Sequence, residues 1–127
     1  MIEHDHADMV RVLTKDPSEI LASLEAHKVD MIHAVMGISG EAGELTDSVK
    51  KYTIYNKPVD HANIIEELGD LEYYMERLRK TCGITRRETL IANMNKLSKR
   101  YPNFKYSDQR AQERADNNDH HQTKPRP

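Results

Sequence analysis

Two long segments of this chain repeat apolar residues at the spacing of an α-helix, and this pattern constrains the fold more than any other feature. From about Lys28, small or apolar side chains recur at alternating intervals of four and three residues, at Met31, Val35, Ile38, Ala42, Leu45, Val49 and Tyr52. The segment 60–82 repeats this spacing at Ile64, Leu68, Leu71, Met75, Leu78 and Cys82. A strand would alternate every second residue, so the pattern predicts two helices with apolar stripes.

Capping residues and helix breakers predict where the helices begin and end. The segment 56–58 separates the two long helices, Asp60 is a suitable N-cap for the second, and Gly83 a suitable left-handed C-cap. Further helix starts are predicted at Asp16-Pro17, at the Thr85/Glu88 capping box and at Ser107. Long helices with short connections pack antiparallel, so the predicted fold class is all-α, an antiparallel helix bundle.

The composition fits one helical domain and argues against several other classes of protein. Residues 1–115 are predicted to form a single domain, and the polar residues 116–127 a disordered tail. A mean hydropathy of -0.83 argues against membrane residence. A net charge of -2 argues against nucleic acid as a partner. The single cysteine excludes an internal disulfide and fits the cytoplasm as the location.

Each long helix carries an acidic pair spaced by three residues: Glu41 with Glu44, and Glu67 with Asp70. All four residues directly precede a stripe position, so we expect them at the half-buried margin of each stripe. If the stripes face each other, the pairs meet at one edge of the contact. Converging carboxylates repel one another unless cations neutralise them, and oxygen ligands suit Mg²⁺ or Mn²⁺. The alternative is a pair of solvated helix faces neutralised by Lys or Arg.

Three glycines interrupt the first stripe, at Gly37, Gly40 and Gly43. Each costs about 1 kcal/mol of helix stability relative to alanine. The pattern therefore predicts either a group that approaches the backbone closely or a flexible kink in the helix.

The sequence around the acidic pairs resembles a known family. Residues 40–45 read GEAGEL, residues 66–71 read EELGDL, and residues 93–102 read NMNKLSKRYP. These stretches resemble the MazG-like all-alpha nucleoside triphosphate pyrophosphohydrolases, in particular the short phage-type members. The resemblance covers roughly residues 28–115 and implies the helical, oligomeric fold of that family.

The resemblance also implies an activity and a set of site residues. The implied reaction is hydrolysis of a nucleoside triphosphate to the monophosphate and pyrophosphate, with Mg²⁺ held by Glu41, Glu44, Glu67 and Asp70. Glu41 or Glu44 is then the candidate to activate the attacking water. Further candidates for contacts to phosphates or the metal site are Lys51, Asn93, Lys96 and Arg114. For each of these four, a solvated helix face is the alternative interpretation.

Several questions stay open at the level of sequence. The phage-type resemblance makes dGTP the first substrate to consider, in remodelling of the phage nucleotide pool. Hydrolysis of dUTP, dCTP or phosphoribosyl-ATP is an alternative, and so is a non-catalytic, metal-binding oligomerisation module. The resemblance implies a homodimer or homotetramer, in which Arg114 acts either within its own chain or across subunits.

Overall fold

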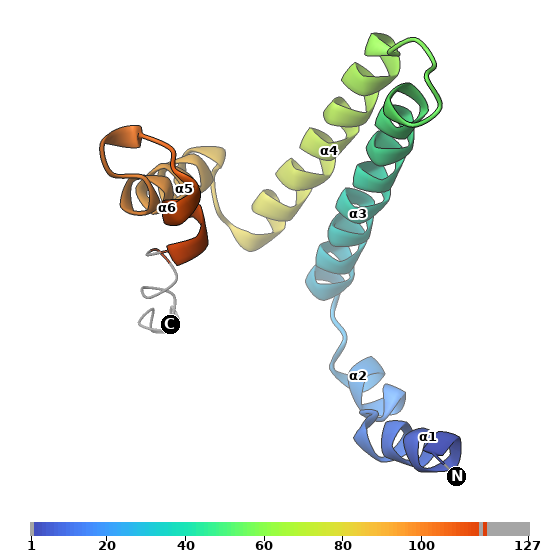
Figure 1. The fold of residues 1–127 in the computed structure, drawn as a ribbon. Coiled ribbons are helices and arrows are strands. Elements are labelled where there is room, and N and C mark those ends of the chain that lie inside the picture. The colour runs from blue at the N-terminus through green and yellow to red at the C-terminus, as the bar shows by residue number, and fades with distance from the viewer. Residues whose placement is uncertain (1, 115, 117–127) are drawn as a thin grey trace. The chain divides into compact units, whose positions relative to one another are not determined.

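The computed structural model describes residues 2–114 and residue 116, with side chains described from residue 5 onward. Within this part of the chain every regular element is a helix, which confirms the predicted all-α fold class (Figure 1). The helices are α1 (Ile2–Leu13), α2 (Pro17–Ser23), α3 (Ala26–Thr53), α4 (His61–Cys82), α5 (Arg86–Arg100), the 3-10 helix η1 (Pro102–Phe104) and α6 (Asp108–Glu113). None of the described helices is both long enough and apolar enough to cross a lipid bilayer.

The chain divides into two compact units, Met1–Thr81 and Cys82–Pro127, and each is described by itself. Most of the predicted tail lies outside the described residues. The exception is Asp116, which is buried and accepts hydrogen bonds from the Arg100 guanidinium at 2.8 and 3.0 Å. The capping box predicted in the second unit is confirmed, since Glu88 N donates to Thr85 Oγ1 and Thr85 N donates to Glu88 Oε2.

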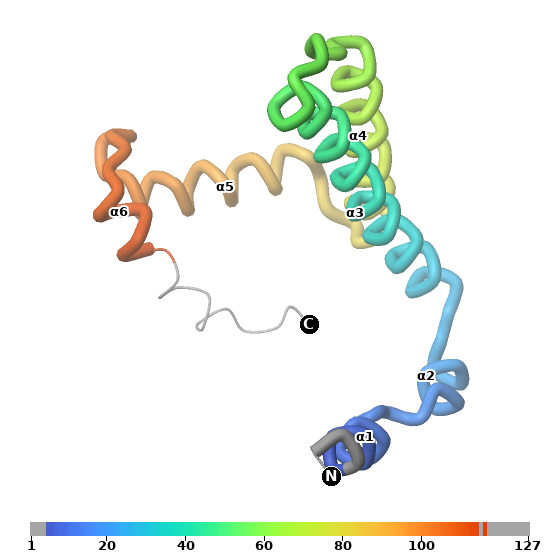
Figure 2. Tube along the Cα trace, turned by 45° about the vertical axis from the view of Figure 1, so that its right-hand side comes forward, coloured from blue at the N-terminus to red at the C-terminus, as the bar shows by residue number. Residues whose placement is uncertain are grey.

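Helices α3 and α4 form an antiparallel hairpin and lie side by side along most of their length (Figures 1 and 2). The cross-helix contacts follow this register, because residue numbers rise along α3 as they fall along α4. The Asp30 carboxylate accepts hydrogen bonds from Arg77 and Thr81, at the end of the hairpin away from the connecting loop. The predicted ends of α4 are confirmed, with Asp60 Oδ1 accepting from the backbone of its first turn and with Gly83 at a φ of 67°.

The contact between the two long helices shares Met31, Ile38 and Leu45 with the predicted stripe of α3, but Ala34, Glu41 and Ser48 take the places predicted for Val35, Ala42 and Val49. The buried or half-buried residues of α3 are Asp30, Met31, Ala34, Gly37, Ile38, Glu41, Leu45 and Ser48. The predicted stripe residues Val35 and Val49 instead expose 51% and 41% of their surface. On α4 the predicted stripe residues Ile64, Leu71, Met75 and Leu78 are half-buried, as are Tyr74 and Thr81, and Glu67 is buried. The predicted Leu68 and Cys82 are exposed.

Small side chains explain why this line packs. Ala34 is fully buried and Ser48 is 7% exposed, so α4 approaches α3 over residues without bulk. At Gly37 the approach is closest, because a Cβ there would lie 2.4 Å from the Tyr74 ring. The prediction that a group approaches the glycine backbone is thus confirmed at this one position.

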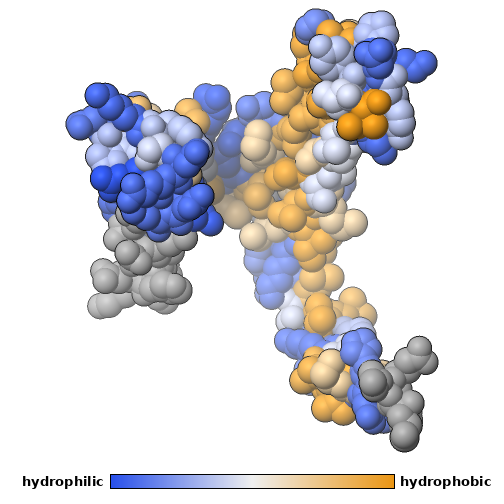
Figure 3. Space-filling view, in the orientation of Figure 1, coloured by the Kyte–Doolittle hydropathy of each residue, from blue (hydrophilic) through white to orange (hydrophobic). Residues whose placement is uncertain are grey.

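The narrow contact leaves much apolar surface exposed. Among the described residues, no large hydrophobic side chain is fully buried. Figure 3 shows apolar surface along the hairpin. Its exposed apolar residues include Ile32, Val35, Met36, Val49, Ile65 and Leu68.

Candidate metal and nucleotide site

Three acidic side chains of the hairpin converge at one point of the contact between α3 and α4. Carboxylate oxygens of Glu41, Glu67 and Asp70 all lie within 4.8 Å of one another. Glu67 is buried, with 6% of its surface exposed, whereas Glu41 is half-buried and Asp70 is exposed. The predicted position at the half-buried margin therefore holds for Glu41, and it is wrong for the buried Glu67 and for the exposed Glu44 and Asp70. The reason is that residues three apart on a helix differ by about 60° in direction, so Glu67 points into the contact and Asp70 away from it.

Two carboxylate oxygens of this cluster are buried without a hydrogen-bond partner among the described residues: Oε2 of Glu41 and Oε2 of Glu67. The other oxygen of Glu67, Oε1, accepts a hydrogen bond from Asn63 Nδ2 at 3.2 Å. A buried ionised oxygen without a partner is costly, so these two oxygens call for a proton or a cation.

The pKa values in the cluster also indicate that its carboxylates need a proton or a cation. Two ionised carboxylates cannot hydrogen-bond each other, but a proton on Glu41 can be shared with Glu67. This proton sharing is the main cause that raises the pKa of Glu41 from 4.5 to about 7, followed by burial and by neighbouring carboxylate charges. The pKa of Glu44 is also raised, first by the charge of Glu67 and then by a hydrogen bond with it. Glu44 thus interacts with the cluster although it is outside the closest group of three. The four predicted acidic residues are brought together.

The donor set of the cluster fits a hard divalent cation. Its members offer only carboxylate oxygens, the ligand type that Mg²⁺ and Mn²⁺ prefer over thiolate or imidazole. One carboxylate oxygen from each of Glu41, Glu67 and Asp70 lies within 4.8 Å of the others, so one cation can join residues of α3 and α4. The arrangement can therefore hold a divalent metal and present it to an anionic ligand at the exposed side, where Asp70 lies.

A polar pocket of about 390 Å³ adjoins the cluster and shares two residues with it, Glu44 and Glu67. Helix α3 lines it with Gly40, Gly43, Glu44, Asp47, Ser48 and Lys51, and helix α4 with Asn63 and Glu67. The predicted contact residue Lys51 is thus brought to the site, where its Nζ lies 3.2 Å from Asp47 Oδ2.

Three polar residues of this pocket were missed by the sequence analysis: Asp47, Ser48 and Asn63. Asn63 precedes Glu67 by four residues, one helical turn, so its spacing from the acidic pair was a usable signal. Ser48 interrupts the apolar pattern on the packed line, and its burial at 7% became evident only with the position of α4.

The remaining predicted contact residues belong to the second unit. Asn93 and Lys96 share a pocket of about 310 Å³ on α5, together with Thr89 and Ala92. Arg114 follows α6 and adopts a left-handed conformation, with a φ of 46°. Their contacts with phosphates or the metal site stay a prediction.

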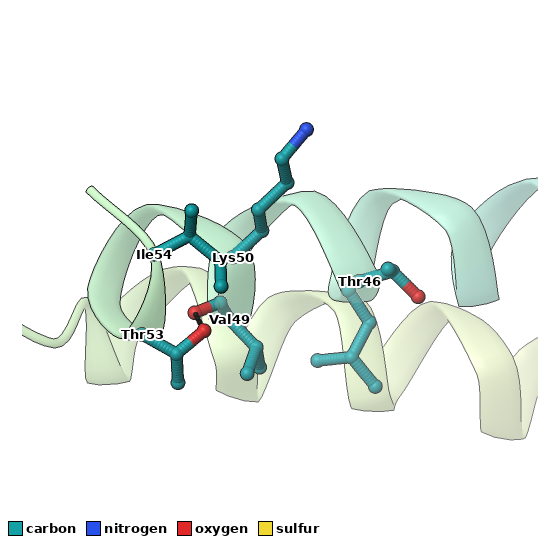
Figure 4. Close-up of a pocket in the computed structure, with 6 residues that line it drawn as sticks. Thr46, Val49, Lys50, Thr53 and Ile54 are labelled. Carbon is teal, nitrogen blue, oxygen red and sulfur yellow. Dashed lines mark hydrogen bonds between the residues drawn. The ribbon is translucent and has the colours of Figure 1, made fainter.

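A second pocket of the hairpin, of about 450 Å³, is apolar and lies at the C-terminal end of α3 (Figure 4). Its hydroxyl groups form hydrogen bonds within α3, since Thr46 and Thr53 donate to the carbonyl oxygens of Ala42 and Val49. Lys50 points its Nζ toward the Tyr55 ring, 5.4 Å from the ring centroid. This pocket offers a hydrophobic contact surface rather than a reactive group.

Comparison with known proteins places this site in a family. The family model of the MazG nucleotide pyrophosphohydrolase domain matches residues 30–105. No curated protein and no solved structure shows a significant match. The matched segment contains the four acidic residues, Lys51, Asn93 and Lys96, and it ends before Arg114. Because the match covers more than half of the 127 residues, the chain belongs to the MazG nucleotide pyrophosphohydrolase family.

Proposed function

We propose that this protein hydrolyses a nucleoside or deoxynucleoside triphosphate, with Mg²⁺ bound, to the nucleoside monophosphate and pyrophosphate. The observation that carries the proposal is the pair of buried oxygens of Glu41 and Glu67 that find no hydrogen-bond partner in the described part of the chain. Their position in a carboxylate cluster of a pyrophosphohydrolase-family domain supports the same reaction.

The proposed metal ligands are Glu41, Glu44, Glu67 and Asp70. The bound cation, Mg²⁺ or in its place Mn²⁺, supplies charge neutralisation of the triphosphate and lowers the pKa of a coordinated water. Asn63 holds the Glu67 carboxylate by its hydrogen bond to Oε1, which leaves Oε2 available to a bound cation.

Proton removal from the attacking water falls to Glu44 or Glu41. Glu44 is the better candidate, since it lies outside the closest group of three and lines the pocket beside it. Attack at the α-phosphorus breaks its bond to the bridging oxygen and releases pyrophosphate. We assign Lys51, Asn93, Lys96 and Arg114 to contacts with the nucleotide.

The exposed apolar surface supports an oligomer, a homodimer or homotetramer, as the working form. Val35 and Val49 carry apolar surface outside the contact of α3 and α4, which a second copy can cover. We further propose a cytoplasmic enzyme that remodels the nucleotide pool, with dGTP as the first candidate substrate.

A panel of nucleoside triphosphates and phosphoribosyl-ATP, incubated with Mg²⁺ and analysed for both products, tests the proposal. We expect pyrophosphate and the monophosphate in equal amounts, and loss of turnover with EDTA. Glu44→Gln and Asp70→Asn should abolish turnover and leave the helical circular dichroism unchanged. Glu66→Gln, an exposed carboxylate beside the cluster, is the matched control and should remain active.

Two results would contradict the proposal. Release of a nucleoside diphosphate and phosphate would show that a different bond is cleaved. Metal binding by calorimetry without binding or turnover of any nucleotide would instead support the non-catalytic oligomerisation module.

A further inference from the structure

Gly40 and Gly43 have no role in the packing of the described chain. A Cβ built at either position meets no described atom within 4 Å, in contrast to Gly37. Among the described glycines, a positive φ occurs only at Gly83, so backbone conformation does not require glycine here either. Alanine would stabilise α3 at both positions. Something outside the hairpin contact must therefore account for the absence of side chains.

Both glycines line the polar pocket beside the carboxylate cluster. Their bare backbone forms the α3 side of this pocket, and Asn63 of α4 lines it as well. The pocket also reaches Glu67, whose Oε2 is buried without a partner among the described residues. At about 390 Å³ it is within the size range of small-molecule sites, about 300–1,000 Å³.

The charges of the lining favour one part of a nucleotide over the other. Three carboxylates line the pocket, those of Glu44, Asp47 and Glu67, and the one lysine that lines it, Lys51, is paired with Asp47 at 3.2 Å. Glu44 and Glu67 are proposed metal ligands and Asp47 is paired with Lys51, so among the described lining residues the pocket offers phosphate oxygens no unpaired cationic side chain. Hydroxyl and amino groups, in contrast, donate hydrogen bonds to carboxylate, amide and hydroxyl oxygens.

We propose that the pocket bounded by Gly40 and Gly43 binds the sugar and base of the nucleotide, whose phosphates are held at the adjacent carboxylate cluster. This inference rests on the proposed function. In this role, the two glycines allow a flat group that donates hydrogen bonds to lie against the backbone of α3.

Substitution of the glycines by alanine tests the inference, because stability and affinity should change in opposite directions. Gly43→Ala and Gly40→Ala should raise the melting temperature by about 3–6 °C. Each added methyl group fills pocket space, so KM for the nucleoside triphosphate should rise about tenfold. Gly43→Leu, also a good helix former, should weaken binding further.

Inorganic tripolyphosphate separates the nucleoside from the phosphates. With Mg²⁺ present, its inhibition constant against the nucleotide should be the same for Gly43→Ala and for the unsubstituted protein. Gly69→Ala is the matched control: its Cβ also meets no described atom within 4 Å, and Gly69 does not line this pocket. It should raise the melting temperature and leave KM unchanged.

Three outcomes would overturn the inference alone: an unchanged KM in both alanine variants, an equal loss of affinity for tripolyphosphate, or dissociation of an oligomer that accounts for the loss. Sedimentation velocity of each variant monitors the last of these. If the unsubstituted protein binds neither a nucleotide nor tripolyphosphate, the proposed function fails as well. The two failures are thus distinguishable.

Discussion

Substitution of Gly37 by alanine probes the closest approach of the two long helices. The added Cβ would lie 2.4 Å from Cδ1 and Cε1 of Tyr74 and 2.5 Å from its Cγ. Ordinary carbon contacts are about 3.5–4.0 Å, so the ring must withdraw by about 1 Å. Rotation of the ring about its own axis does not move Cγ. Relief therefore requires a new position of the whole side chain or a wider spacing between α3 and α4.

The expected magnitude follows from three contributions. Overpacking of this kind costs about 1–3 kcal/mol. Displacement of Tyr74 also weakens its edge-on contact with Tyr73, at 5.1 Å between centroids, and such pairs contribute about 1 kcal/mol. The better helix propensity of alanine offsets about 1 kcal/mol. We therefore expect Gly37→Ala to lower the free energy of unfolding by about 2 kcal/mol.

Urea unfolding followed by circular dichroism measures this change. Gly69→Ala, which meets no described side chain, should raise the free energy of unfolding by about 1 kcal/mol, so the two glycines of the hairpin should respond with opposite signs. In a Tyr74→Ala background the ring is absent, and Gly37→Ala should become stabilising there. A Gly37→Ala protein as stable as the unsubstituted one, or one still destabilised without the Tyr74 ring, would refute the reasoning.

Three further predictions concern the ionisable groups of the hairpin. Because the folded protein raises the pKa of Glu41 from 4.5 to about 7, it binds this proton more tightly than the unfolded chain does. The stability of the metal-free protein should therefore fall as pH rises from about 4.5 through about 7. Melting temperatures measured across this range should show the decrease in EDTA and not in Mg²⁺. Glu41→Gln removes one of the repelling charges, so it should raise the metal-free melting temperature at pH 8 and reduce the further rise on addition of Mg²⁺; a lower metal-free value would contradict this. The hydrogen bonds of Thr81 and Arg77 lower the pKa of Asp30 below 3.8, so its stabilisation is present above that pH and is lost as pH falls below it; Asp30→Asn should lower the melting temperature at pH 7 and have little effect near pH 2.

The helices and their ends were predictable because local interactions determine them. Thr85 and Glu88 cap α5 with hydrogen bonds that span three residues, and Gly83 ends α4 through its own backbone conformation. Neither depends on how the helices pack. The alternating spacing of apolar residues likewise required no partner to predict a helix.

The face by which α3 packs was not predictable in the same way. The line through Ala34 and Ser48 and the line through Val35 and Val49 are neighbours on one helix, and the second is the more hydrophobic. The first packs on α4 because its residues are small enough to admit Tyr74 against Gly37. That choice depends on a residue 37 positions away in the sequence, which no local pattern encodes.

The site, too, could be predicted only in part, because its details depend on which face of α3 packs on α4. The acidic motifs identified which residues meet, but the depth of Glu67 followed only from the choice of packed face. Asn63 and the glycine-lined pocket required the register of α4 against α3, which relates residues of both helices to one another. The family pattern thus predicted the acidic residues of the cluster, and the packing defined the pocket beside it.

The carboxylate cluster lies within the contact between α3 and α4, so the stability of the metal-free hairpin depends on it. Glu41 and Glu67 repel each other in the middle of the hairpin, where apolar side chains would normally hold two helices together. The interactions that oppose this repulsion lie on both sides of the cluster. Toward one end they are the hydrogen bonds of Asp30 and the packing of Tyr74 over Gly37, and toward the connecting loop they are the half-buried Leu45 and Ile64 and the buried Ser48. Asp30 is about 16 Å along α3 from Glu41, so it fixes the register of the helices without neutralising the carboxylates. The hairpin therefore positions two buried oxygens that have no hydrogen-bond partner among the described residues. On the proposed function, a cation held by them would join the helices at the point where their carboxylates repel each other.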